Sequence, residues 1–230
     1  SPDLLMIMLQ SAGVWMFDDN GEVFIAENEV IREIVEVYAE LIKSGVLVEV
    51  NDWDQYISSF NRGTVAGTIN GCWIIGSITP QTEQKGMWRI TNIPKLDKAA
   101  NAVNYSNQGG SSWMVLSSSE HSDLAIDFLK HTFAGSVDLY ETILPSSGAL
   151  ATYLPAGDSD VYNEPHEFFG GQAIYSDITK FASKVPQVNY GVYNYEARDA
   201  IGNAITQIIS GADIDAALRE AEETVKFLMW

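Results

Sequence analysis

The sequence is poor in cysteine, in basic residues and in long apolar runs, and each shortage excludes a class of protein. The single cysteine, Cys72, excludes an internal disulfide and a cysteine-based zinc cluster. Lys and Arg number 13 against 31 Asp and Glu, giving a formal net charge of −18. This charge argues against a nucleic-acid partner, because phosphate recognition needs clustered cations. No apolar run reaches the roughly 18 residues expected of a membrane-spanning helix.

Catalytic and metal-binding motifs are also missing. His121 and His131 are too far apart in sequence to share a metal ion, and His166-Glu167 lacks the second histidine of a zinc-protease helix. Carboxylates are plentiful, and a glycoside hydrolase needs only two of them at the right separation. Most of them fall on helix faces, where solvated side chains are the default. We therefore predict no catalytic residue, no metal and no cofactor, with a glycoside hydrolase as the alternative.

The chain does contain enough apolar character for a sizeable core, since 46% of its 230 residues are hydrophobic. Periodicity and end signals predict helices over residues 3–10, 28–44, 54–60, 72–78, 122–133, 137–144, 167–182, 194–210 and 213–228. Short runs bounded by turn residues predict strands over residues 64–69, 87–93 and 113–116, and residues 186–190 are predicted to be extended. Strands that alternate with longer helices indicate an α/β fold.

Several ends of these elements have specific signals. Asn28 and Asp213 are predicted N-caps, and Pro145 is predicted to end the helix over residues 137–144. Asp18-Asp19-Asn20-Gly21 predicts a hairpin turn, because Asn-Gly favours the positive φ angles of a type I′ turn. Calcium binding by this loop is the alternative, although it lacks a later Glu at EF-hand spacing.

The stretch from Phe60 to Ile78, FNRGTVAGTINGCWIIGSI, organises the rest of the chain. It is typical of a helix end, a turn, a buried strand, a second turn at Asn70-Gly71 and a new helix. The second turn lies at the carboxyl end of the strand, where open α/β sheets usually bind ligands. Trp73 follows this turn and offers a flat apolar face to a ligand. The alternative is that Trp73 is a core residue.

A second glycine-containing turn precedes the strand that begins at Trp113. Paired glycines at 109 and 110 let the backbone approach another group closely. The spacing and the missing lysine exclude a P-loop, and Trp113 occupies the last glycine position of a G-x-S-x-G elbow. A plain glycine bend is the alternative interpretation.

The order of these motifs resembles a known family. F-N-x-G-x-x-A-x-x-I-N-G-x-W over residues 60–73 is followed by a strand ending at Pro94, by Gly-Gly-Ser before a strand, and by a helix with A-x-x-F-L. The chain then continues with LPSSGA over residues 144–149, EARDA over residues 196–200 and a final D-x-A-L helix. This order is similar to that of maltose-binding-protein-like carbohydrate-binding proteins of ABC importers, extracellular solute-binding protein family 1.

The resemblance implies an α/β, type II periplasmic-binding-protein-like fold with two lobes and a sugar in the cleft. It implies that the chain is a C-terminal portion of such a protein. Residues 1–94 and 151–230 would be the C-terminal lobe, and residues 95–150 would be a returning segment of the N-terminal lobe. Residues 95–150 are then expected to pack poorly by themselves, and a non-binding structural fragment is a further alternative.

The resemblance also implies a function: an extracellular receptor that delivers a carbohydrate to the membrane permease of an ABC importer. The location would be extracellular, periplasmic or on the cell surface as a lipoprotein. Trp73 would stack on a sugar ring, and Asn194 falls near a position that is often aromatic in the family, although the local spacing differs. The predicted ligand-binding residues are Gly71, Trp73, Gln108, Gly109, Gly110, Ser111, Tyr193, Asn194 and Tyr195.

Overall fold

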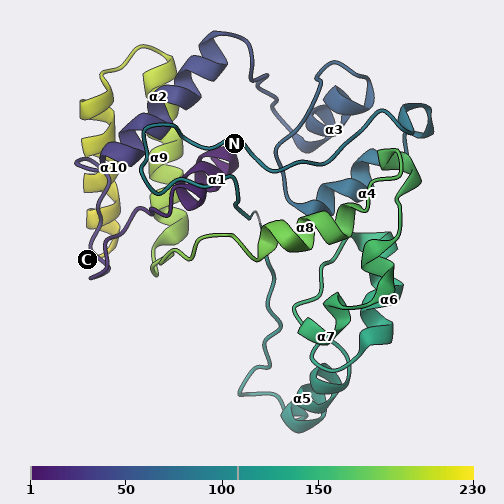
Figure 1. The fold of residues 1–230 in the computed structure, drawn as a ribbon. Helices are drawn as coiled ribbons and strands as arrows, with labels where there is room; N and C mark the ends of the chain where they lie inside the picture. Colours follow the sequence, from purple (N-terminus) through teal and green to yellow (C-terminus); the bar gives the residue numbers. More distant parts are fainter. Residues whose placement is uncertain (1, 108) are drawn as a thin grey trace. The chain divides into compact units, whose positions relative to one another are not determined.

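The structure is a computed structural model that describes residues 2–107 and 109–230. The chain divides into two compact units, each described here by itself (Figure 1). Unit 1 comprises Ser1–Trp53, Asn92–Gln108 and Lys184–Trp230, and unit 2 comprises Asp54–Thr91 and Gly109–Ser183. These units are defined by contacts within the chain. The predicted assignment of residues 1–94, 95–150 and 151–230 to the lobes of a larger protein stays a prediction.

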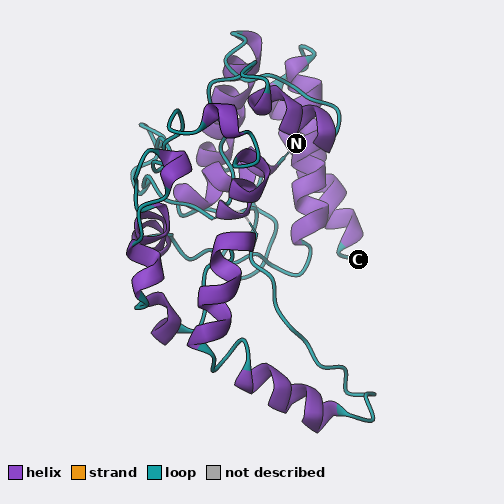
Figure 2. Cartoon of the chain, turned by 90° about the vertical axis from the view of Figure 1, so that its right-hand side faces the viewer, coloured by secondary structure: helices purple, strands orange, loops and turns teal. Residues whose placement is uncertain are grey.

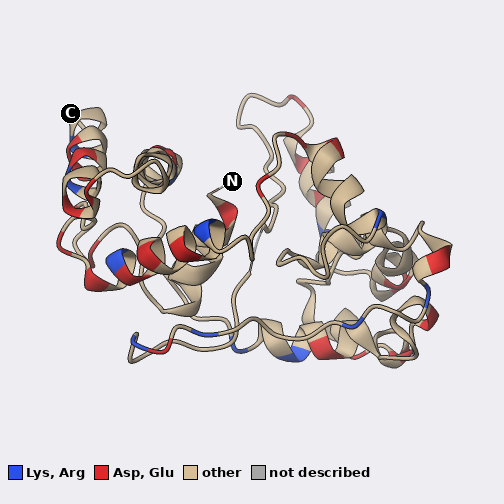
Figure 3. Ribbon diagram, turned by 90° about the horizontal axis from the view of Figure 1, so that it is seen from above, with Lys and Arg blue, Asp and Glu red and all other residues tan. Residues whose placement is uncertain are grey.

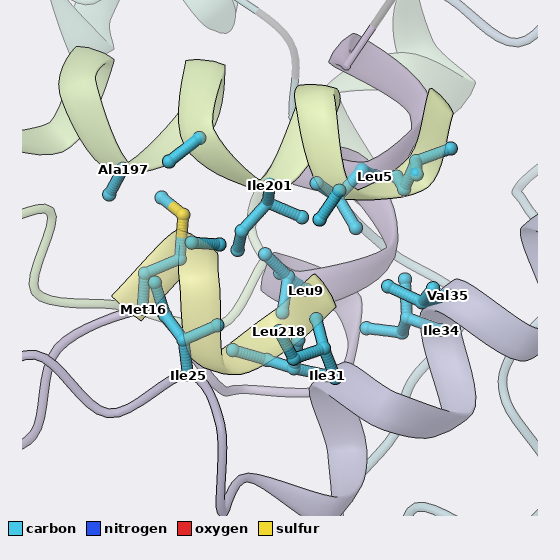
Figure 4. Close-up of a cluster of buried hydrophobic side chains, with 14 of the residues drawn as sticks. Leu5, Leu9, Met16, Ile25, Ile31, Ile34, Val35, Ala197, Ile201 and Leu218 are labelled. Atoms are coloured by element: carbon cyan, nitrogen blue, oxygen red, sulfur yellow. The ribbon is translucent and has the colours of Figure 1, made fainter. Parts of the chain in front are cut away.

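Unit 1 is a helical assembly around a single apolar core. Its helices in the described part of the chain are α1 (Asp3–Ser11), α2 (Glu29–Lys43), α9 (Asn194–Ile209) and α10 (Ile214–Leu228). Helices α9 and α10 pack against each other, and α2 contacts both α1 and α9. Figure 4 shows Leu5, Leu9, Ile31, Ile201 and Leu218 pointing toward one another from four helices. All five are fully buried, so segments far apart in sequence share one core.

Two predicted N-caps of unit 1 are confirmed. The Asn28 side-chain oxygen accepts hydrogen bonds from the backbone N–H groups of Val30 and Ile31 at the start of α2. The Asp213 carboxylate accepts one from the N–H of Ala216 at the start of α10. Each cap provides a partner for backbone donors that have none within the helix.

A turn forms at the predicted place in unit 1, but it is not of type I′, because in the described residues only glycines have a positive φ and Asn20 therefore does not. Phe17 and Val23 form an antiparallel bridge, and Gly21 adopts a positive φ of 81° between them. Asp18 accepts hydrogen bonds from the backbone N–H groups of Asn20 and Glu22, and the bond from Glu22 is the main reason that its pKa is lowered. The Asp18 carboxylate thus closes the turn.

Unit 2 contains shorter elements around a smaller core. They are α3 (Trp53–Asn61), α4 (Ile75–Ile78), α5 (Ser122–His131), α6 (Val137–Ser147), α7 (Leu154–Gly157) and α8 (Ile174–Ala182), with 3-10 turns η1 (Cys72–Ile74), η2 (Thr82–Gln84), η3 (Asp160–Asn163) and η4 (Glu167–Phe169). The core is rich in aromatic side chains, including Phe60, Phe169 and Tyr175. Phe60 packs edge-on against Tyr56 and Trp88.

Two predicted helices of unit 2 have different bounds. Residues 167–182 do not form one helix, because Gly170 and Gly171 adopt positive φ angles of 62° and 83° between η4 and α8. Pro145 does not end its helix, since α6 continues to Ser147. Near a helix end Pro removes only one hydrogen bond. The hydroxyl groups of Ser146 and Ser147 both donate to the carbonyl of Ile143 there.

The predicted strands form no ladder in the residues described, and residues 64–66 of the first one are a bend. The only bridges there are two isolated ones, Phe17 with Val23 and His166 with Gln172, and Figure 2 draws helices and loops. A ladder needs a neighbouring strand about 4.8 Å away. At Ile90 a side chain takes that place: Gln172 Oε1 accepts from the Ile90 N–H at 2.9 Å, and its Nε2 donates to the Ile90 carbonyl at 2.7 Å.

Residues 111–135 contribute little to the core of unit 2. Helix α5 has no buried residue, and Trp113 and Leu124 are 67% and 69% exposed. By contrast Leu96 is buried in unit 1 and Leu144 is buried in unit 2. The stretch that packs poorly is therefore shorter than the predicted residues 95–150. No helix in the described residues is both long and apolar enough to cross a membrane.

Candidate functional site

The segment that precedes Trp73 is fixed by side chains of unit 2, and its Gly71 is extended rather than part of the predicted turn. Asn70 Nδ2 donates to the Tyr56 hydroxyl at 2.9 Å, and Asn70 Oδ1 accepts from the Gly71 N–H at 2.7 Å. The Tyr56 hydroxyl also forms a hydrogen bond with Thr68 Oγ1. Tyr56 lies on α3, so this network joins the segment to a helix whose Phe60 is fully buried. The backbone that carries Trp73 is thereby held in one place.

Trp73 itself lies at the surface of unit 2. It is the middle residue of η1, and its side chain is 41% exposed, whereas its neighbours Ile74 and Ile75 are buried. The two isoleucines anchor the short helical segment in the core, and the indole is left with an accessible face. This exposure differs from that of Trp15, which is 5% exposed in the core of unit 1.

The glycine pair lies beside Trp73 within unit 2. A Cβ at Gly109 would come 3.6 Å from Trp73 Nε1, which is an ordinary contact, and a Cβ at Gly110 would meet nothing within 4 Å. The backbone at Gly110 thus approaches no other described part of the chain closely, and a close approach to a ligand stays a prediction. The need for glycine comes from the backbone instead, because φ is 106° at Gly109 and 102° at Gly110.

The structure thus brings Gly71, Trp73 and Gly109 together in unit 2, with Gly110 and Ser111 following in an exposed segment. Gln108, another predicted ligand-binding residue, lies outside the described residues.

The three remaining predicted residues belong to unit 1. Asn194 is the first residue of α9, and its Oδ1 accepts the indole N–H of Trp15 at 2.9 Å. Tyr193 packs against the apolar core. Tyr195 is 67% exposed, and the Arg198 guanidinium lies over its ring, 4.9 Å from the centroid.

Sequence reasoning missed a polar network next to these residues. Gln10 is only 6% exposed, and its amide contacts the Tyr190 hydroxyl, Ser106 and the backbone of Asn107. Tyr190 in turn packs edge-on against Trp15, with ring centroids 4.8 Å apart. The available signal was a glutamine at a buried position of an otherwise apolar helix, because a buried amide needs hydrogen-bond partners from elsewhere in the chain.

Acidic residues outnumber basic residues along the chain, and they are drawn red and blue on the ribbon of Figure 3. The pKa of Glu167 is lowered, chiefly by a hydrogen bond from Lys85. At Glu222 burial raises the pKa, but hydrogen bonds from Lys226 and from the backbone N–H groups of Ala26 and Ile25 leave it lowered overall. No group of three or more His, Cys, Asp or Glu side chains in the described part of the chain is placed to hold a metal ion.

Comparison with known proteins gives consistent matches. Residues 1–144 match the family model described as bacterial extracellular solute-binding protein. A lactose-binding protein from Rhizobium radiobacter is 34% identical over 220 residues, which cover 96% of this chain and 52% of that protein. The chain therefore spans about half the length of the curated relatives it matches.

Two solved structures share the fold. A maltose/maltodextrin-binding domain from Bdellovibrio bacteriovorus, bound to maltotriose, has a TM-score of 0.72 at 14% identity, with 100% of this chain and 58% of that chain covered. An ABC transporter-associated binding protein from B. animalis subsp. lactis Bl-04, in complex with beta-1,6-galactobiose, has a TM-score of 0.73 at 19% identity, with 99% and 58% covered. At these identities the likeness shows the fold alone.

Proposed function

The chain belongs to the bacterial extracellular solute-binding protein family, and from this membership we propose that it is part of a carbohydrate receptor of an ABC importer. Its fold is of the type II periplasmic-binding-protein-like kind. Because the chain spans about half the length of its curated relatives, the ligand and the partner of the whole protein are proposals. The partner would be the membrane permease of the importer.

The exposed indole of Trp73 is the observation that carries this proposal. A sugar ring has one face of C–H groups, and an aromatic plane can cover that face while polar groups replace water around the hydroxyls. Trp73 is 41% exposed in η1, and Asn70 and Tyr56 hold the segment before it in place. Gly71, Gly109, Gly110 and Ser111 are the predicted ligand contacts nearest to it in unit 2. The lactose-binding relative supports a sugar as the ligand class.

We further propose that the protein binds sugar without transforming it. A glycoside hydrolase needs a general acid whose pKa is raised. Asp18, Glu167 and Glu222 have lowered pKa values, so these three residues are not candidates for such an acid. The family consists of solute-binding proteins, which supports a receptor.

The family description supports a location outside the cytoplasm. Anchoring as a cell-surface lipoprotein is a finer proposal. Labelling intact cells with a reagent that does not cross membranes, followed by membrane fractionation, would test both. A protein found only in the soluble cytoplasmic fraction would contradict them.

A thermal-shift screen of the intact protein against mono- and oligosaccharides tests the proposed function. A ligand that binds only the folded state raises the melting temperature, and the rise grows with ligand concentration. Incubation with the same sugars, followed by chromatography, separates a receptor from a hydrolase. Turnover of an oligosaccharide would overturn the receptor proposal, and the absence of any carbohydrate ligand would overturn the proposed ligand class.

Replacement of Trp73 tests the site itself. We expect Trp73→Ala to weaken sugar binding by about 1–3 kcal/mol, a typical loss for an aromatic contact. Folding should survive, because the side chain is 41% exposed. Trp230→Ala is the matched control, since Trp230 is fully exposed at 102% and lies in the other unit. Calorimetry measures the affinity; equal losses in both variants would rule out a specific role for Trp73.

A further inference from the structure

Gln10 and Tyr190 form the strongest unassigned feature of the molecule. Gln10 lies on α1, is 6% exposed and makes three hydrogen bonds to segments far away in the sequence. Its Oε1 accepts from the backbone N–H of Asn107 at 2.8 Å and from Ser106 Oγ at 3.0 Å. Its Nε2 contacts the Tyr190 hydroxyl at 3.3 Å. A buried amide has a fixed orientation when both its oxygen and its nitrogen form hydrogen bonds.

The direction of each hydrogen bond follows from the chemistry of the partners. A backbone N–H only donates, so the atom of Gln10 that faces Asn107 must be the oxygen. The atom that faces Tyr190 is then the NH₂ group, which only donates. The Tyr190 oxygen accepts this bond, so its own proton points away from Gln10. The phenol thus has a donor available for a further acceptor.

The ring of Tyr190 is fixed as well as its hydroxyl. The ring packs edge-on against the buried Trp15, at an interplanar angle of 89°, and it remains 44% exposed. Two neighbouring residues that were predicted to contact the ligand already have partners within the chain. Arg198 covers one face of Tyr195, and Asn194 accepts the Trp15 N–H. Tyr190 therefore combines a held ring, partial exposure and a hydroxyl proton that is not used by Gln10.

We propose that Tyr190 is a ligand-contact residue of unit 1, which donates its hydroxyl proton to an oxygen of the bound sugar. Gln10 is the positioning residue, because its amide accepts no proton from Tyr190 and so leaves the phenol proton free for the ligand. Sugar hydroxyl, ring and glycosidic oxygens all accept hydrogen bonds of this kind. This inference rests on the proposed carbohydrate function.

Two conservative variants separate positioning from simple packing. Tyr190→Phe removes the donor and keeps the ring. Gln10→Glu, measured at pH 8, keeps an acceptor for Asn107 and Ser106 but turns the remaining atom into an acceptor, so the Tyr190 proton is drawn inward. We expect each variant to weaken the affinity for the best sugar from the thermal-shift screen about fivefold, the usual net value of one hydrogen bond. The double variant should lose no more than either single variant.

Tyr153→Phe is the matched control, because it removes a phenol hydroxyl from a residue of unit 2 that is not a predicted ligand contact, and its affinity should equal that of the unchanged protein. Calorimetry on the intact protein measures all five affinities, and melting temperatures establish that each variant is folded; if Gln10→Glu does not fold, Tyr190→Phe decides alone. Unchanged affinity in a folded Tyr190→Phe or Gln10→Glu variant overturns this inference. The proposed carbohydrate function is tested separately, and it still holds if Trp73→Ala loses sugar binding. If the unchanged protein binds no carbohydrate, both fall together.

Discussion

Helices α2 and α5 are both amphipathic in sequence, yet the structure uses them in opposite ways. In α2 the apolar face is buried, with Ile31, Ile34 and Val35 all fully covered in the core of unit 1. In α5 no residue is buried, and Leu124 and Phe128 are 69% and 59% exposed. The difference shows that an apolar stripe specifies which face a helix can bury, while a packing partner decides whether it is buried.

The segment around α5 contains a local aromatic contact, in contrast to the long-range packing of unit 1. Trp113 packs against Phe133 with ring centroids 5.0 Å apart, and both residues belong to the segment of residues 111–135. Met114 and Leu116, next to Trp113 in sequence, are 85% and 72% exposed. Large exposed apolar patches are uncommon in soluble monomers.

The largest expected effect comes from making the same substitution in both regions. Leu218→Ala should lower the free energy of unfolding by about 2–5 kcal/mol, because Leu218 is fully buried in the core of unit 1. Leu124→Ala should change it by less than about 0.5 kcal/mol, since the side chain is largely exposed. Urea unfolding followed by circular dichroism gives both values. Equal losses would mean that Leu124 is covered in solution.

Amide hydrogen exchange tests the comparison without a substitution. We expect amides in α5 to exchange about a hundredfold faster than those in α9, because α5 can open without exposing any buried side chain. Mass spectrometry of peptides from the two helices gives the rates. The helix α2, with its buried face, is the internal reference. Slow exchange in α5 would break the comparison and indicate a covering partner.

The smallest expected effect concerns a pair of hydrogen bonds between two segments of unit 1. The Glu222 carboxylate accepts hydrogen bonds from the N–H groups of Ile25 and Ala26, which joins α10 to the segment after the hairpin. We expect Glu222→Gln to lower stability by about 1 kcal/mol at pH 7. Glu223→Gln, on the same helix but exposed, is the control.

The pH dependence of this effect has a definite sign. The pKa of Glu222 in the folded protein lies below its ordinary value of 4.5. The carboxylate therefore contributes its stability at neutral pH, and the contribution is lost as the pH falls from 4.5 through the lower folded-state value. Unfolding curves at pH 7 and at acidic pH should show the difference between variant and parent shrinking. If the difference in stability between variant and parent does not change with pH, the Glu222 carboxylate is not its source.

Local signals in the sequence predicted much of unit 1. Asn28 and Asp213 are caps, and the Asp18 to Gly21 turn forms, because each depends on neighbours within a few residues. Predictions that depended on distant partners did less well. The segment at residues 87–93 has strand composition, but the partner of Ile90 is the side chain of Gln172, which no local pattern reveals.

The candidate site shows the same limit. The new helical segment that begins at Cys72 follows from nearby residues, but Gly71 before it is extended, so the predicted turn at Asn70-Gly71 is wrong. The order of motifs along the chain was enough to indicate the family. Tyr190 was predicted only as the end of an extended segment. Its pairing with Gln10 joins positions 180 residues apart, so only the folded chain reveals it.

The environment of the single thiol of the chain determines how readily it reacts in an oxidising medium. Cys72 donates to the carbonyl of Gly148 at 3.3 Å, and burial raises its pKa. The thiolate is the form that attacks disulfides and peroxides, so a thiol kept protonated at neutral pH reacts slowly with both. Cys72 lies next to Trp73, and the packing that holds it in place also lowers its reactivity. It is therefore a poor site for a disulfide between two copies of the protein or for adducts with small thiols.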